Sequence, residues 1–380
     1  EIQHFHAGSV AQPADCPLAN GNMLFNSGSI TVENRGALNV EAHLISSGSI
    51  HVKPTARLDG SGYIEMTTQG SSLYVDSDAS LPFCGLLTYN QDSTVRIMPD
   101  GNFVRLPFDW CNGGPEWDDV LRHVYNDLEL TQALKDPACQ IVAIDCDLEL
   151  NGDWVFSKNV CVAGSVTIHD GSLTLCNEAY MISGDTRVEN GNIIIEDGST
   201  WLNRSDLRCR ELIVRDSAFF NTGWFSEVGR ISVEGSNFCN VTGSIDLTGR
   251  TLTINGRFIS LSHLYLHDCD ITISEGAELG SFNGNFAIDS GCRIENHGHI
   301  GLHGWEWQEM TLDANMVNYG TLSVADGAKL YGSIVNHGEI HVHGFIPVNG
   351  TVENRGRIIN YYGKLYAVDG EITGNAPVNP

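Results

Sequence analysis

The sequence predicts an all-β protein built as a parallel β-helix, or β-solenoid, with a short helical insert near its middle. Three observations predict this fold. Short segments of alternating apolar residues are separated by turn residues, the turns recur at intervals near 20 residues, and 41 glycines stand against only 11 prolines in 380 residues. A period of this length is typical of solenoids, in which each turn buries its apolar side chains only against neighbouring turns.

The C-terminal third carries the clearest repeat. Its segments include "IENHGHIGLHG", "IVNHGEIHVHG" and "VENRGRIINYYGKL", each a strand pattern joined to an Asn-x-Gly turn. The turn glycines are separated by 22, 18 and 18 residues: Gly298, Gly320, Gly338 and Gly356. From residue 338 to 370 a glycine recurs every six or seven residues, so three short strands fit in each turn. Asn at these corners tolerates a left-handed backbone and can donate its amide to the next Asn in a ladder.

The chain divides into four expected segments. These are an N-terminal arm at 1–19, a short β-solenoid at 20–112, a helical cap or linker at 113–139 and a second β-helix at 140–380. In the first solenoid "SGSI" occurs at 27–30 and 47–50, a period of 20 residues. In the linker, "EWDDVLRHVY" has helical spacing, and "DLELTQALKDP" has an Asp N-cap with Pro137 as its stop. We therefore expect helix at 116–135.

The motifs that follow resemble a known family. "QALKDP" and then "IVAIDCDLEL" are similar to the opening of secreted and surface-attached bacterial β-helix proteins of the pectate-lyase-like superfamily. The tail resembles the Asn-Gly-rich repeats of large bacterial adhesins. The resemblance covers most of the chain and implies a right-handed helix, an extracellular or cell-surface location and a cap on the second solenoid. Its motifs specify fold and context, not chemistry.

The charge of the chain limits its partners. With 21 basic and 47 acidic residues the formal net charge is −26, which repels DNA, RNA and anionic lipid. We expect no nucleic-acid partner and no membrane insertion, because no apolar run is long enough to cross a bilayer. Polyanionic sugars are disfavoured unless cations bridge them to the protein. Calcium is the one cofactor left open, because "VDSDAS" at 75–80 and "DCD" at 145–147 and 268–270 supply oxygen ligands without EF-hand spacing.

An enzyme is the minority interpretation. A polygalacturonase-like chain would be expected to carry paired carboxylates and a Gly-His-Gly motif in a fixed order. Here "NHGHIG" and "CRIENHG" are in the wrong order, Glu295 replaces the expected Lys, and the Asp-Asp pair at Asp118 and Asp119 falls in the expected helix. We assign no catalytic residue, and a glycan-cleaving enzyme stays the third interpretation.

Two groups of aromatic residues are binding candidates. Alternation places Trp305 and Trp307 on one face, where paired indoles could stack on sugar rings, although a loop that buries both explains the pattern equally. His341 and His343 also share a strand face and suggest a metal site; outward polar residues on a solenoid wall are the alternative. The sequence does not identify the metal.

The hexapeptide "TVENRG" occurs at 31–36 and again at 351–356. Both solenoid ends are expected to be open and alike, so that the last turn of one molecule stacks on the first turn of the next. Duplication with unrecognised caps, or a fragment cut from a larger adhesin, are the alternatives. The expected polymer interface comprises Met23, Leu24, Phe25, Ile30, Val32, Ile358, Leu365, Val368 and Ile372.

These observations favour an extracellular bacterial structural protein that self-associates head-to-tail, as a fibre or surface-layer subunit. A carbohydrate-binding surface adhesin, with glycan as partner, is the alternative from a different class.

Six of the eleven cysteines show regular spacing. Cys146, Cys161 and Cys176 are 15 residues apart, and Cys209, Cys239 and Cys269 are 30 apart. We expect inward positions for these residues, because free Cys is among the most buried residue types. Disulfides between coils are the alternative, and Cys16 in the arm is the expected exposed exception.

Overall fold

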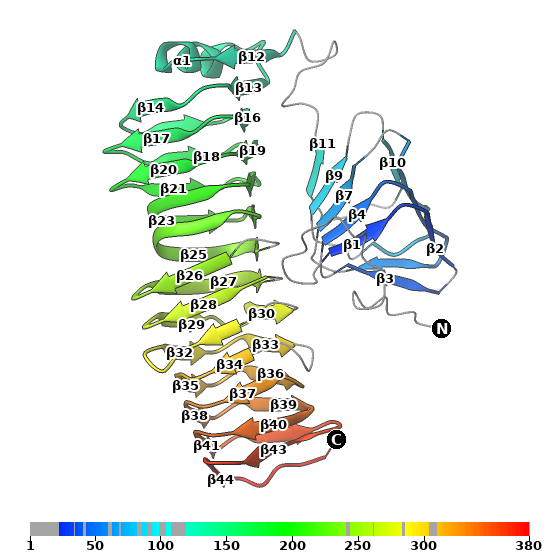
Figure 1. Cartoon of the computed structure of the whole chain (residues 1–380), viewed down its shortest axis with the longest axis vertical. Helices are drawn as coiled ribbons and strands as arrows, with labels where there is room; N and C mark the ends of the chain where they lie inside the picture. The colour runs from blue at the N-terminus through cyan, green and yellow to red at the C-terminus, as the bar shows by residue number, and fades with distance from the viewer. Residues whose placement is uncertain are drawn as a thin grey trace. The chain divides into compact units, whose positions relative to one another are not determined.

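The computed structural model describes residues 23–379 except 34, 41–42, 60–62, 68–69, 82–85, 90–92, 99–103, 108–118, 241–243, 261, 283–285 and 304–309. Strands make up 63% of the described residues and helix 3%, and the strands form a parallel β-solenoid of about 15 turns (Figure 1). The predicted all-β solenoid is confirmed. The chain divides into two compact units, Glu1–Leu121 and Arg122–Pro380, and the division falls inside the expected linker.

The first unit is a short three-sided solenoid. All its paired strands are parallel, in the orders β1-β4-β7-β9-β11, β10-β8-β5-β2 and β3-β6. The two "SGSI" copies lie in register on adjacent turns, as the period of 20 predicts, with Ile30 opposite Ile50. The strands are β1 (Met23–Asn26), β2 (Ser29–Val32), β3 (Ala37–Asn39), β4 (His43–Ser46), β5 (Ser49–Val52), β6 (Arg57–Asp59), β7 (Tyr63–Met66), β8 (Ser72–Val75), β9 (Leu86–Tyr89), β10 (Thr94–Ile97) and β11 (Val104–Pro107).

The second unit begins with a strand and a helix and continues as a regular β-helix. Its first half contains β12 (Leu121–Val124), α1 (Asp127–Lys135), β13 (Ile141–Ile144), β14 (Leu148–Asn151), β15 (Trp154–Phe156), β16 (Asn159–Val162), β17 (Val166–His169), β18 (Leu173–Leu175), β19 (Tyr180–Ser183), β20 (Thr186–Glu189), β21 (Asn192–Ile195), β22 (Thr200–Asn203), β23 (Asp206–Arg215), β24 (Ala218–Asn221), β25 (Trp224–Asn240), β26 (Ser244–Thr248) and β27 (Thr251–Ser260). Its second half contains β28 (Leu264–His267), β29 (Asp270–Ile273), β30 (Glu278–Phe282), β31 (Phe286–Ile288), β32 (Arg293–Asn296), β33 (His299–His303), β34 (Met310–Leu312), β35 (Asn315–Asn318), β36 (Thr321–Ala325), β37 (Ala328–Leu330), β38 (Ser333–Asn336), β39 (Glu339–His343), β40 (Phe345–Val348), β41 (Thr351–Asn354), β42 (Arg357–Asn360), β43 (Lys364–Ala367) and β44 (Glu371–Gly374).

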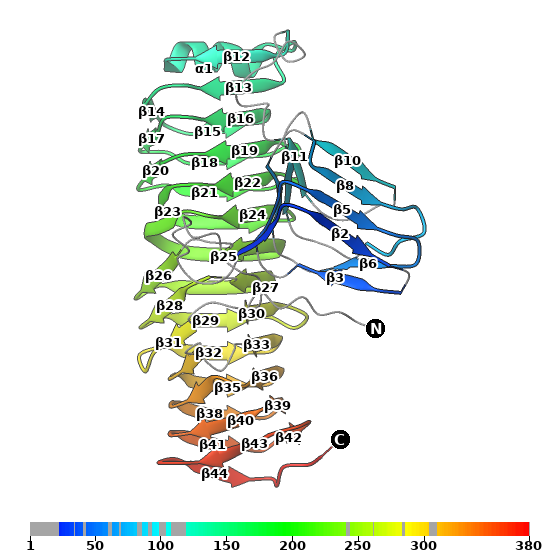
Figure 2. The ribbon, with the colours of Figure 1, turned by 45° about the vertical axis from the view of Figure 1, so that its right-hand side comes forward.

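Three parallel ladders run the length of this unit, and we name them by their first strands. The β13 face continues through β16 and β19 to β42, the β14 face through β17 and β20 to β43, and the β15 face through β18 and β21 to β44. The long strands pass around corners: β23 and β27 contribute to two faces each, and β25 contributes to all three. Figures 1 and 2 show the turns of this unit stacked from α1 to β44.

The interior of the second unit is one continuous apolar column. It includes a run of stacked aromatic rings, with the centroids of Phe238 and Phe258 4.3 Å apart and nearly parallel. At one corner a ladder of buried amides replaces the apolar residues. Asn296 donates from Nδ2 to Oδ1 of Asn318 (2.7 Å), Asn318 to Asn336 (2.7 Å) and Asn336 to Asn354 (2.8 Å). The predicted Asn ladder is confirmed, and its steps are the same 22, 18 and 18 residues.

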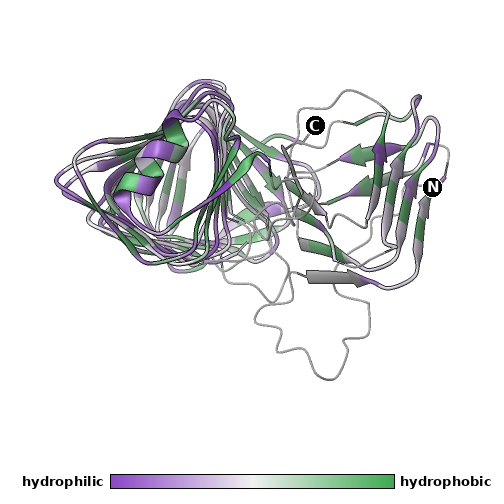
Figure 3. Ribbon diagram, turned by 90° about the horizontal axis from the view of Figure 1, so that it is seen from above, coloured by the Kyte–Doolittle hydropathy of each residue, from purple (hydrophilic) through white to green (hydrophobic). Residues whose placement is uncertain are grey.

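The helical segment is shorter than expected. Residues 121–124 of "EWDDVLRHVY" form strand β12, so the prediction of helix there is wrong, and 113–118 lie outside the described residues. Among the described residues of this segment only α1 is helical, and its N-cap is Asn126, not the predicted Asp127. Leu130 and Ala133 of α1 are buried in the apolar column. Figure 3 shows α1 lying across the end of the coil, where it covers apolar residues of the first turn.

The repeated hexapeptide adopts two different conformations. In the first unit β2 ends at Val32, Arg35 has a left-handed backbone with φ 67°, and the Gly36 amide donates to the Glu33 carbonyl (2.7 Å). In the second unit the strand β41 continues to Asn354, which belongs to the amide ladder. The two copies were expected to lie in equivalent turns at the two ends of the chain. This expectation is wrong, because the copies occupy different positions within their turns.

Candidate functional site

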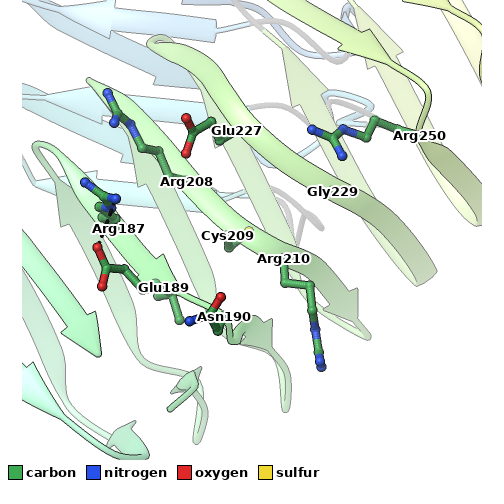
Figure 4. A pocket seen from close by; sticks show the side chains of 10 residues that line it. Arg187, Glu189, Asn190, Arg208, Cys209, Arg210, Glu227, Gly229 and Arg250 are labelled. Carbon is green, nitrogen blue, oxygen red and sulfur yellow. Dashed lines mark ion pairs between the residues drawn. The ribbon is translucent and has the colours of Figure 1, made fainter. Parts of the chain in front are cut away.

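A groove rich in arginine lies along the corner between the β14 and β15 faces. Its volume is about 640 Å³, and both polar and apolar atoms line it. We call it the arginine groove. Its lining residues are Arg187, Val188, Glu189, Asn190, Arg208, Cys209, Arg210, Glu227, Gly229 and Arg250 (Figure 4).

Strand register brings the charged residues together. Arg187 on β20 lies directly opposite Arg208 on β23, and Arg208 lies opposite Glu227 on β25. Figure 4 shows Arg208 and Glu227 on the same side of these strands, whereas Arg210 points another way. Like charges directly opposite each other on neighbouring strands are destabilising. An anion bound between Arg187 and Arg208 would relieve this repulsion.

The groove arginines differ in how far the protein neutralises them. Arg187 pairs with Glu189 (Nη2 to Oε1, 2.9 Å), and Arg208 pairs through Nε with Asp206 (2.7 Å). Arg210 donates from Nε to the side-chain oxygen of Asn192 (3.1 Å), which is neutral. Arg250 is exposed and has no ion pair with any described residue. A guanidinium has five N–H donors, so the single-donor contacts of Arg208 and Arg210 leave most of their capacity unused.

The corner is shaped by backbone packing. The register between β23 and β25 shifts between Leu207 and Arg208, where β25 has one extra residue, Ser226, so β25 carries a bulge at the groove. Gly229 follows on the next turn, and a Cβ at that position would collide with the carbonyl oxygen of Arg210. Gly249 has a left-handed backbone with φ 65° and turns the chain immediately before Arg250. The missing side chains at these glycines leave room between the long arginines.

A second charged cluster borders the groove. Glu189 also contacts His169, with 2.7 Å between its Oε2 and the imidazole Nδ1, and His169 contacts Glu149 through Nε2. These two carboxylates raise the pKa of His169 above its usual value, the contact with Glu189 contributing most. The His169 contact in turn lowers the pKa of Glu189, which stays ionised beside Arg187. The flank of the groove therefore changes its charge as His169 titrates.

The sequence did not predict the arginine groove. The net charge of −26 describes the whole chain and hides a local group of four arginines. One signal was present: Arg187 and Arg208 are 21 residues apart, close to the length of one turn, and Arg208 and Glu227 are 19 apart. Because turn length varies from 18 to 24 residues in this unit, spacing alone does not show which outward residues meet.

The expected polymer-interface residues lie on the first turn of one unit and the last turns of the other. Met23, Leu24 and Phe25 belong to β1, and nothing is described of their side chains. Ile30 and Val32 on β2 pack into the core of the first unit. In the second unit Ile358 is fully buried and Leu365 is nearly so, Ile372 is partly buried, and Val368 is exposed.

The other predicted candidates are only partly visible. Trp305 and Trp307 lie outside the described residues. His341 and His343 share a strand face as expected, with ring centroids 6.5 Å apart, and both contact the ring of Tyr361. Within the described part of the chain no group of three His, Cys, Asp or Glu side chains is placed to hold a metal ion. No helix in that part is long and apolar enough to span a membrane.

Comparison with protein-family models, with curated proteins and with solved structures finds no match to this chain. The β-solenoid is shown by the structure itself, whereas the resemblance to the pectate-lyase-like superfamily and to adhesins rests on the quoted motifs alone.

Proposed function

We propose that this chain is an extracellular, non-enzymatic β-helix protein that binds an acidic polysaccharide in the arginine groove. The observation that carries the proposal is the meeting of Arg187, Arg208, Arg210 and Arg250 on one groove of a strongly acidic molecule. Guanidinium groups match carboxylate and sulfate oxygens through parallel hydrogen bonds. This proposal replaces the expectation from net charge, because the local field at a binding groove differs from the average over the surface.

A polymer suits the groove better than a small anion. The lining residues come from strands β20, β23 and β25 and from the turn after β26, so the groove crosses several turns of the coil. Neighbouring turns repeat at about 4.8 Å, so the guanidinium groups of Arg187 and Arg208, on adjacent turns, match the spacing of neighbouring anionic groups of a chain laid along the corner. The next turn presents Glu227 and the turn after it Arg250. Glu189 holds the guanidinium group of Arg187 in place, and Asp206 holds that of Arg208.

Binding assays with matched polymers test the proposal. The purified chain is titrated with dextran sulfate, with alginate and with uncharged dextran, and binding is followed by calorimetry at low and high salt. We expect binding to the two acidic polymers, no binding to dextran, and weaker binding as salt rises. The double variant Arg208→Gln/Arg250→Gln should bind at least about tenfold more weakly, because each charge-assisted hydrogen bond contributes on the order of 1.5–3 kcal/mol.

A matched control separates the groove from overall charge. The double variant Arg355→Gln/Arg357→Gln removes the same charge from the C-terminal turns, where both arginines are exposed and paired with glutamates. It should bind like the wild type. If both double variants lose the same affinity for the acidic polymers, net charge and not the arginine groove accounts for binding. Wild-type binding to uncharged dextran alone would contradict the proposal. Release of reducing ends from any of the polymers would favour the enzyme interpretation instead.

Head-to-tail association is the second candidate function. Large apolar side chains with exposed surface gather in the C-terminal turns, namely Tyr319, Tyr331, Phe345, Tyr361, Tyr362, Tyr366, Val368 and Val378. Among the described residues β43 and β44 each pair along one edge, and so do β1, β2 and β3 of the first unit. Exposed apolar surface and unpaired strand edges are the features that strand addition between copies uses.

A further inference from the structure

We propose that Cys269 and Cys292 are a modification site, where an intrachain disulfide forms when the protein folds in an oxidising solution. The two residues occupy matching positions on adjacent turns. Cys269 immediately precedes Asp270 of β29, Cys292 immediately precedes Arg293 of β32, and Asp270 and Arg293 are partners in the ladder. The Arg293 amide donates to the Cys269 carbonyl (2.9 Å), which fixes the register at the cysteines themselves. The proposal is independent of glycan binding.

The side chains of this pair point the same way. Both are buried, with 1% exposure for Cys269 and none for Cys292. The Cys269 amide donates to the sulfur of Cys292 (3.2 Å), so the Cys292 thiol lies against the backbone of its partner. Neighbouring strands are about 4.8 Å apart, and disulfides join residues whose Cα atoms are roughly 4.4–6.8 Å apart. The spacing of neighbouring strands therefore lies within the range of Cα separations that a disulfide spans.

The two thiols have complementary chemical roles. The Cys292 thiol beside Cys269 is the main cause that lowers the pKa of Cys269 to about 7, and the same contact raises the pKa of Cys292. In the folded chain Cys269 is therefore the more readily ionised of the two thiols, and the thiolate is the reactive form. Its thiolate attacks oxidised glutathione, forms a mixed disulfide and releases one glutathione thiolate. Cys292 then loses its proton, attacks the Cys269 sulfur and releases the second glutathione, so two electrons pass from the cysteines to one glutathione disulfide.

Burial determines when the reaction takes place. An oxidant cannot reach side chains with so little exposure in the closed coil, so the bond forms while the turns assemble or during local opening. Cys209 provides an internal comparison. It is also buried, but its partner in the ladder is Val228, and burial raises its pKa. A disulfide between these two adjacent turns at Cys209 is therefore impossible, although its exposure resembles that of the proposed pair.

Oxidative refolding of the full chain tests the proposal. Reduced, denatured protein is refolded in a mixture of reduced and oxidised glutathione, and β-structure is checked by circular dichroism. The product is then unfolded, alkylated, digested and analysed by mass spectrometry. We expect a peptide pair joined through Cys269 and Cys292, about 2 Da lighter than the sum of the free peptides, with Cys209 alkylated. Reduction should lower the midpoint of thermal unfolding by roughly 5 °C.

The Cys292→Ser variant provides the control. It should leave Cys269 alkylated or carrying glutathione, with no linked peptide at that residue. Alkylation of both Cys269 and Cys292 in refolded wild-type protein would overturn the proposal. So would a linkage that joins either residue to a different cysteine. Neither result depends on whether the serine variant folds.

Discussion

At the scale of single residues, the amide ladder is a set of buried polar side chains that depend on one another for hydrogen-bond partners. Asn318 has no exposed surface, accepts a hydrogen bond from Asn296, and donates to Asn336 and to the backbone carbonyls of Gly320 and Glu339. Each amide orients the next, so loss of one member leaves polar groups of its neighbours buried without partners. The ladder therefore acts as a unit.

Replacement of one ladder residue should lower the stability of the protein measurably. Asn318→Ala is expected to lower the free energy of unfolding by about 3 kcal/mol, because it orphans the amides on both sides and leaves a small cavity. Asn315→Ala, at an exposed position of the same strand, should change it by less than about 0.5 kcal/mol. Urea denaturation of the two variants measures the difference. Similar values for both would mean that the ladder adds little to stability.

The contacts of His169 give a pH dependence. Its pKa is raised in the folded chain by Glu189 and Glu149, above the 6.5 of an unperturbed histidine. Its stabilising contribution is therefore complete below about pH 6.5 and is lost as the pH rises through the raised value. The thermal midpoint of His169→Gln should lie furthest below that of the wild type near pH 5.5, and the two should converge in the alkaline range. A difference that stays constant from pH 5 to 9 would show that the ion pairs do not form.

At the scale of elements, strand pairing determined which residue patterns became helix. Leu121 and Val124 are three residues apart, a spacing that fits a helix, yet they are the buried ends of strand β12. The Val124 carbonyl accepts from the Asp145 amide (3.4 Å), so the segment joins the parallel ladder. Such pairing depends on residues twenty positions away, which a local pattern does not contain. The turns with Asn-Gly corners were predicted correctly, because the backbone conformation of each corner depends on the Asn and Gly residues of that corner itself.

Helix α1 has the local signals that the sequence can supply. Its N-cap Asn126 accepts from the Glu129 amide (2.9 Å), and Glu129 Oε2 accepts from the Tyr125 amide (2.8 Å). This reciprocal arrangement satisfies donors at the start of the helix. The Asp at 127 resembles a cap in sequence, but it is the first helical residue, where its charge suits the positive end of the helix.

Removal of the cap should weaken the end of the coil. Asn126→Ala is expected to cost about 1 kcal/mol, whereas Asn126→Gly should cost only a few tenths, because glycine lets water reach the exposed amides. Hydrogen exchange of the amides in α1 and β13 reports the local effect, and denaturant titration the global one. If alanine and glycine cost the same, the side-chain contact is not what stabilises the helix.

At the scale of the whole molecule, the two units explain what the sequence could and could not predict. Composition and periodicity predict two solenoids, because every turn repeats the same sequence pattern of short strands joined by corners. Their surfaces depend on register. The arginine groove arises from residues whose outward positions coincide only after turns of 21 and 19 residues are stacked. The repeated hexapeptide shows the same limit, because identical letters lie in different parts of the turn.

Association between copies is the property that spans the whole molecule. The proposal brings the turn formed by β43 and β44 of one copy against β1, β2 and β3 of the next. Backbone hydrogen bonds and apolar contacts such as Val368 would then hold the joint, and Val368 is 54% exposed in the single chain. Each copy carries a net charge of −26, so repulsion opposes the contact and salt screens it. Association should therefore strengthen as salt rises, the opposite of the salt effect expected for the arginine groove.

Val368→Asp should weaken this association at least about tenfold, because it adds a charge to the joint and removes exposed apolar area from it. Val155→Asp is the matched control: Val155 is 52% exposed on β15, near the α1 end of the second unit, and should not affect association. Sedimentation velocity over a range of protein concentrations, at low salt, high salt and with calcium, measures the effect. Wild-type protein that stays monomeric under all three conditions would rule out head-to-tail association. Equal weakening by both variants would place the contact elsewhere on the surface.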